Sequence, residues 1–306
     1  MSSILTNNSA MSALSTLRNI NNNLNDTQGR ISTGLKVNSA KDNASYFSIS
    51  ETMKGDSSMY KAINESLTLT KNSIATGRLG ADSFKDLATQ FVERVAFAQG
   101  AEGGLEEVEA ELQNLVSQMK TTISQSTFNG SDYVNAAATV NVAGSIDAAT
   151  GVVTSGTAET STNTIVTGVS RGSGSLATTT LDVDTVDLSV LAEDFDLIAA
   201  SFATNAGNAT TGAAFLDGAL ASAETIQSGA IDAATDLGLA EKAIETQQKF
   251  LTNLVDNLDS GVGAMVDANM EEEAARLQSL QVQQQLATQS LSIANQAPQN
   301  ILSLFR

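Results

Sequence analysis

The sequence predicts a mainly α-helical protein: long heptad-patterned helices in a rod-like coiled-coil bundle formed by both termini, with a small central β-rich or mixed insert. Apolar residues recur every seventh position over long stretches, which is typical of helices that pack side by side. The two ends of the 306-residue chain carry similar patterns. Aromatic residues make up only 4%, Trp is absent and there is one Pro, so small and aliphatic side chains must fill the core.

The longest pattern lies between Tyr46 and Ala98. Every seventh residue there is apolar or amphipathic: Tyr46, Met53, Tyr60, Leu67, Ile74, Ala81, Ala88 and Val95. Companion positions three residues later include Ile49, Ile63, Phe84, Phe91 and Ala98. A helix of this length would extend about 80 Å and needs partner helices along its course. Two further heptad runs, at 105–123 and 237–258, complete a predicted helical bundle.

Both termini carry shorter seams of their own. The N-terminal seam contains Leu14, Leu17, Leu24 and Ile31, and the C-terminal seam contains Leu277, Leu280, Leu291, Ile301 and Phe305. We expect breaks at 38–45 and at 259–263, because both stretches are polar or glycine-containing. The predicted division is a terminal helical pair (1–44 with 260–306), a bundle (45–136 with 225–259) and a variable, surface-exposed domain (137–224).

The terminal seams are weak as isolated helices. The first is rich in Asn and Ser, which are poor helix formers, and two helices alone bury little apolar area. We therefore expect these segments to fold when neighbouring subunits cover them. The nine seam residues named above are the predicted polymerisation seam.

The central segment has a different composition. It is rich in Thr, Ser and Gly, and short alternating runs at 140–142 and 164–166 predict strands, with disorder as the alternative. No heptad seam continues between Ile123 and Leu237. We therefore expect residues 140–215 to be dispensable for assembly.

Composition also bounds the function. The chain has no His and no Cys, which removes Ser-His-Asp and Cys-His catalysis and nearly all zinc sites. We expect no enzyme, no cofactor and no metal. The net charge of −18 would repel phosphate backbones and anionic lipids, so we expect neither nucleic acid nor a membrane as partner. Residues 1–10 show no secretion signal, which leaves the cytoplasm or export without a cleaved signal.

Three local patterns could carry chemistry but have simpler explanations. The run 271–273 of three Glu residues is better explained as a solvated helix face. Asp182, Asp184 and Asp187 lack the Gly and the final Glu of an EF-hand loop. The glycines of 172–177 have no following helix pattern and are better explained as a loop.

Two terminal motifs resemble those of a known family. The stretch 30–44, RISTGLKVNSAKDNA, and the stretch 294–306, ANQAPQNILSLFR, resemble the N- and C-terminal signatures of bacterial flagellins. The turn at 127–130, TFNG, is similar to one in the same family. The resemblance covers roughly 1–135 and 225–306, and Tyr46 and Phe47 resemble the alphaproteobacterial branch.

The resemblance implies a structural subunit that polymerises into the flagellar filament for swimming. It also implies an extracellular location, export through the flagellar type III apparatus without a cleaved signal, and contact with an export chaperone and a filament cap. A hook–filament junction protein and a secreted coiled-coil adhesin are the alternatives.

The segment Gln90, Phe91, Val92, Glu93 and Arg94 lies where many flagellins carry an arginine-rich stretch bound by a vertebrate innate receptor. Phe91 and Glu93 replace the arginines expected there. The heptad positions predict that Phe91 faces the bundle and that Glu93 is exposed. Altered receptor recognition is therefore the expectation.

Overall fold

A computed structural model of the chain describes residues 7–100, 103–135, 143–157, 161–170 and 177–304, with side chains as far as residue 296. The chain divides into two compact units. We call Met1–Ser58 with Leu254–Arg306 the terminal unit, and Met59–Asn253 the bundle unit. Most described residues are helical and the strands form short antiparallel pairs, so the predicted mainly α-helical fold is confirmed.

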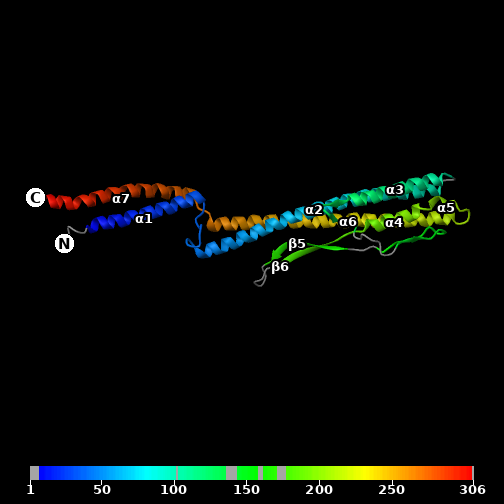
Figure 1. Ribbon diagram of the computed structural model, residues 1–306, viewed down its shortest axis with the longest axis horizontal. Helices are drawn as coiled ribbons and strands as arrows, with labels where there is room; N and C mark the ends of the chain where they lie inside the picture. Colours follow the sequence, from blue (N-terminus) through cyan, green and yellow to red (C-terminus); the bar gives the residue numbers. More distant parts are fainter. Residues whose placement is uncertain (1–6, 101–102, 136–142, 158–160, 171–176, 305–306) are drawn as a thin grey trace. The chain divides into compact units, whose positions relative to one another are not determined.

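The terminal unit is built on an antiparallel pair of helices. They are α1 (Asn8–Thr33) and α7 (Met270–Leu304), which lie side by side in Figure 1. The pairing of the two ends is as predicted. Polar contacts at three levels fix the register: Asn7 Nδ2 to the Ala294 carbonyl (2.8 Å), Gln284 Nε2 to Asn21 Oδ1 (2.7 Å), and Arg30 to Glu273 (3.2 Å).

Both helices of this pair are interrupted at the same level. Helix α1 ends at Gly34, whose φ of 74° suits a residue without a side chain. The following residues run antiparallel to the segment before α7, because the Lys36 N–H donates to the Val266 carbonyl and the Ala268 N–H to the Gly34 carbonyl. A small apolar cluster of Val37, Val262 and Val266 packs beside this contact.

The predicted C-terminal break is in the wrong place. Helix α6 (Gly212–Val266) runs straight through 259–263, and the interruption comes at residues 267–269. Gly261 lies within this helix beside the end of the Met53 side chain, which would have to shift to admit a Cβ. Asn269 then caps α7 through a hydrogen bond from the Glu271 N–H.

Helix α2 (Ala44–Gln99) carries the longest predicted seam. Its positions from Leu67 to Ala98 are buried as predicted, but Tyr46 and Ile49 are 48% and 46% exposed. At the start of α2 the inner face passes instead through Phe47, which packs on the valine cluster, and through the buried Ser50. The predicted face is therefore wrong by one residue at that end.

The bundle unit combines the later part of α2, α3 (Leu105–Gln125) and the earlier part of α6 with short central elements. These are strands β1 (Thr127–Phe128) and β2 (Ser131–Asp132), β3 (Ser145–Ile146) and β4 (Val153–Thr154), and β5 (Thr162–Ser170) and β6 (Ala177–Asp184), followed by helices α4 (Leu188–Ala199) and α5 (Phe202–Ala206). Each successive strand pair is antiparallel. The strand predicted at 164–166 is confirmed within β5, whereas 140–142 lies outside the described residues.

The central segment supplies part of the bundle core, which was not expected. Phe195, Phe202 and Phe215 are fully buried. The ring of Phe195 lies 4.6 Å from that of Phe91 and 6.2 Å from that of Phe84, centroid to centroid. The expectation that 140–215 is dispensable conflicts with this packing. The predicted three-part division stays a prediction. The core of the bundle runs across its boundary between residues 224 and 225, because Ala223 and Ile226 belong to the same buried cluster.

The loop between β3 and β4 is packed tightly on α6. Gly151 has a φ of 69° and lies against the backbone of Phe215, and Gly218 lies against the Thr150 carbonyl, so neither position has room for a Cβ. The Val153 N–H donates to Ser222 Oγ at 3.0 Å, and Ser222 Oγ donates to the Gly151 carbonyl at 3.3 Å. This segment is fixed to the bundle rather than hanging from it.

None of the helices in the described part of the chain combines the length and hydropathy needed to traverse a bilayer.

Candidate polymerisation surface

The predicted seam residues meet within one chain. Leu17, Leu24 and Ile31 of α1 are half-buried, and so are Leu277 and Leu291 of α7. Leu280 is only 8% exposed and Leu14 is 38% exposed. The side chain of Ile301 and the whole of Phe305 lie outside the part that the structure describes. The seam therefore closes the α1–α7 pair of a single subunit.

A polar contact stabilises one end of this pair. Glu273 has a side chain only 7% exposed, and its Oε1 lies 3.2 Å from Arg30 Nη1 and 3.8 Å from Arg276 Nη1. Its other oxygen is buried with no hydrogen-bond partner in the described structure. A buried carboxylate held from one side is costly if its cation is removed. Arg30, part of the N-terminal motif, thus fixes the register of the two helices.

A second apolar stripe on α7 was missed by the sequence reasoning. Val282, Leu286 and Ile293 are 54%, 60% and 64% exposed, on the side away from the seam, and Met11 of α1 is 63% exposed. We call Val282, Leu286 and Ile293 the outer stripe. Their spacings of four and seven residues are helical. The sequence did contain a signal for this stripe, because no charged residue occurs between Leu277 and Leu304, and a helix that is solvated on one face normally carries charges there.

An uncharged helix face with large exposed apolar side chains is unusual for a surface that stays in water. Charged residues are depleted at the centres of protein interfaces, and each large apolar side chain buried there contributes about 1.5–3 kcal/mol. The outer stripe therefore has the composition of a contact surface rather than of a solvated face.

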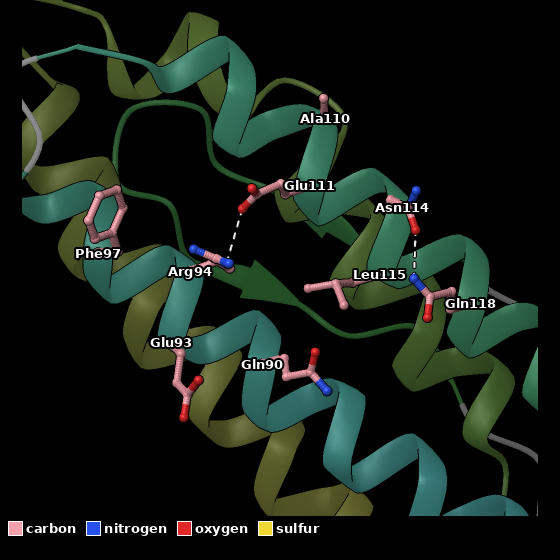
Figure 2. A pocket seen from close by; sticks show the side chains of 9 residues that line it. All are labelled: Gln90, Glu93, Arg94, Phe97, Ala110, Glu111, Asn114, Leu115 and Gln118. Atoms are coloured by element: carbon pink, nitrogen blue, oxygen red, sulfur yellow. Dashed lines mark hydrogen bonds and ion pairs between the residues drawn. The ribbon is translucent and has the colours of Figure 1, made fainter.

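The predicted receptor segment borders a groove between α2 and α3 (Figure 2). The groove has a volume of about 670 Å³ and is lined by Gln90, Glu93, Arg94, Phe97, Ala110, Glu111, Asn114, Leu115 and Gln118. Arg94 Nε reaches Glu111 Oε2 at 3.0 Å, whereas Glu93 points away from α3. Phe91 is buried, Val92 is half-buried, and Gln90 and Glu93 are exposed. The predicted orientations of Phe91 and Glu93 are confirmed.

The carboxylates that resembled a cation site have other roles. Asp187 caps α4 by accepting from the Ser189 N–H at 3.1 Å, and Asp184 accepts from the Thr162 hydroxyl at 2.6 Å. Among the described residues, no three acidic side chains are arranged to hold a metal ion. Glu271 and Glu272 are exposed at the start of α7, where their negative charges interact favourably with the positive end of the helix dipole and stabilise the helix.

One carboxyl group lies inside the bundle core. Asp194 of α4 is 1% exposed, and neither of its oxygens has a well-aligned hydrogen-bond partner in the described structure. It packs against Gly144, where a Cβ would collide with Asp194 Oδ1. Burial raises the pKa of the Asp194 carboxyl, and the nearby Ser155 hydroxyl and Gly156 N–H offset this only in part.

Comparison with known proteins gives matches over nearly the whole chain. Residues 4–139 match the family described as bacterial flagellin N-terminal helical region, and residues 220–305 match bacterial flagellin C-terminal helical region. The flagellin of Brucella melitensis biotype 1 is 34% identical, and flagellin C of Rhizobium meliloti strain 1021 is 35% identical. Flagellin A of Rhizobium meliloti is 31% identical. Each alignment covers 100% of both chains.

Proposed function

The chain belongs to the bacterial flagellin family and is a structural subunit of the filament that serves motility. We propose that the outer stripe of α7 joins each subunit to its neighbours in this filament. The predicted seam residues then act inside the subunit, where they hold α1 and α7 together. The alternatives of a junction protein or an adhesin are not favoured, because the matched family and its named relatives are flagellins.

The observation that carries this proposal is the exposure of Val282, Leu286 and Ile293 on the part of α7 that follows Arg276, which contains no charged residue as far as Leu304. The pair α1–α7 buries one stripe of each helix and leaves this one uncovered. A two-helix pair is marginal in water, so covering the outer stripe with another copy both stabilises the pair and drives addition to the filament.

The test is a charge placed in the outer stripe. Leu286→Asp and Ile293→Asp are expected to lower seeded elongation at least tenfold. A carboxylate buried without a partner costs more than about 1.4 kcal/mol, the equivalent of one tenfold change. Thr288→Asp is the matched control, because Thr288 is exposed on a different side of α7. This variant should polymerise normally. If both stripe variants elongate like the native protein while their helicity is unchanged, the stripe is not the contact.

We also propose the finer partners that the family implies. The chain would leave the cell unfolded through the flagellar type III apparatus, bound beforehand by an export chaperone, and join the extracellular filament beneath a cap. The absence of Cys and the single Pro support this, because no crosslink forms and few bonds isomerise slowly. Retention of the protein inside cells that lack the export apparatus is the expected result, and normal secretion there would contradict it.

A catalytic role is not proposed. The chain has no His and no Cys, and in the described structure Asp187 serves as a helix cap and Glu273 as an ion-pair partner.

A further inference from the structure

A face of α2 in the bundle unit combines exposed apolar and acidic residues. Leu79 and Phe97 are 66% and 63% exposed, and Asp86 and Glu93 are exposed between them. At 100° per residue, the offsets of 7, 14 and 18 from Leu79 place all four within about 40° of one another around the helix. We call these four residues the acidic face.

A face of α6 in the same unit combines exposed apolar and basic residues. Leu239 and Phe250 are 64% and 57% exposed, and the side chains of Lys242 and Lys249 are 71% and 69% exposed. These four residues are the basic face. Glu245 lies between the lysines at 3.4 and 3.1 Å, and both lysines lower the pKa of its carboxyl. The face keeps an excess of one cation.

These cations stand out in a strongly acidic chain. The net charge is −18, and Arg171 is the only Lys or Arg between residues 121 and 241. Copies of such a chain repel one another, so contacts between them need local complementarity. Exposed ion pairs such as those of Glu245 contribute little to stability, which leaves the two lysines available for a new partner at small cost.

The spacing of the charges allows one-to-one matching. Lys242 and Lys249 are seven residues apart, as are Asp86 and Glu93, and seven residues span about 10.5 Å of helix. The two faces lie on different helices, so a contact between them is heterologous. It leaves the acidic face of one copy and the basic face of the other free for further copies. A heterologous contact that does not close into a ring gives an open-ended polymer.

We propose that the basic face of one subunit packs against the acidic face of a second copy in the filament, with Lys242 and Lys249 opposite the carboxylates of Asp86 and Glu93. This inference rests on the role as a filament subunit and adds a lateral contact between bundle units, independent of the outer stripe of α7. The four apolar side chains lose their exposed area in the same contact.

The test uses reversed charges. One variant carries Lys242→Glu with Lys249→Glu, so both of its faces are acidic. A second carries Asp86→Lys with Glu93→Lys, so both of its faces are basic. Each alone is expected to elongate seeds at least tenfold more slowly than the native protein. An equimolar mixture of the two is expected to elongate within about threefold of it, because each basic face then meets an acidic one.

The variant with all four changes is the control for net charge, since it restores −18 with both faces reversed, and it should also assemble. Unchanged thermal unfolding of each monomer checks folding. Native elongation by either double variant overturns the inference, and so does a mixture that fails to assemble. If the double variants assemble normally while Leu286→Asp does not, the lateral contact is wrong and the proposed role of α7 stands.

Discussion

Replacing Phe195 with Ala tests whether the central segment belongs to the bundle core. Phe195 is fully buried, and its ring lies 4.6 Å from Phe91 at an interplanar angle of 51°. Truncation of a buried Phe costs about 3–5 kcal/mol, including about 0.5–1.5 kcal/mol for the ring contact. Domains are stable by about 5–15 kcal/mol in all, so the loss is a large fraction of the stability.

Thermal unfolding of the monomer, followed by circular dichroism, measures the effect. In a unit of this size, 1 kcal/mol shifts Tm by about 2–4 °C, so Phe195→Ala should lower Tm by roughly 6–20 °C. The matched control is Phe97→Ala, because Phe97 is 63% exposed and its loss should change stability by less than about 0.5 kcal/mol. A loss of less than about 1 kcal/mol in Phe195→Ala would refute the assignment and return the central segment to a detached insert.

Three further predictions concern the same unit. Replacement of 140–215 by a short Gly/Ser linker should abolish cooperative thermal unfolding, because it deletes Phe195 and Phe202 from the core; a cooperative transition at the native Tm in that variant would contradict this. Asp194→Asn should remove a pH dependence of Tm. Because the folded pKa of Asp194 is raised, the native protein loses stability as the pH rises from the ordinary Asp value through the raised one, and the variant lacks this contribution; parallel slopes of Tm against pH for the two proteins would exclude the effect. The native monomer should activate the vertebrate flagellin receptor weakly, because an exposed Glu93 stands where the receptor meets Arg in the family; in a reporter-cell assay, a Glu93→Arg variant no more active than the native monomer would count against this.

The long helices could be predicted because large apolar residues mark their inner faces. Leu67, Ile74 and Val95 on α2 and Leu112 and Met119 on α3 are all buried as the heptads indicated. The pairing of α1 with α7 followed from two seams of similar length. These elements depend on local periodicity, which a single sequence displays directly.

The first half of α6 was missed because its inner face is made of small residues. Ala219, Ala223, Ala230 and Ala233 are buried at helical spacing, but Ala carries a weak apolar signal and is common on exposed helix faces too. The heptad run visible in the sequence therefore begins only at Leu237, although the predicted bundle starts at residue 225. Helix α4 was missed for a different reason, since its 12 residues are too short for a heptad repeat and lie in a Thr-rich stretch.

The outer stripe of α7 illustrates a third limit. Heptad reasoning assigns one seam to a helix, and in α7 the seam used inside the subunit gave the stronger pattern. Only the coordinates separate the side chains that α1 covers from Val282, Leu286 and Ile293, which it leaves exposed. The heptad repeat that predicts the α1–α7 contact within a subunit therefore does not also identify the proposed contact surface between subunits.

The matched interruptions of α1 and α7 also have a mechanical consequence. Three backbone hydrogen bonds join the segments there: Lys36 N and Val37 N to the Val266 carbonyl (2.6 and 3.3 Å), and Ala268 N to the Gly34 carbonyl (2.8 Å). Such bonds lie across the direction of the chains. Sliding of one segment along the other would therefore strain all three together instead of opening them one after another. The three bonds therefore oppose a change of register between α1 and α7 at the level where both helices are interrupted.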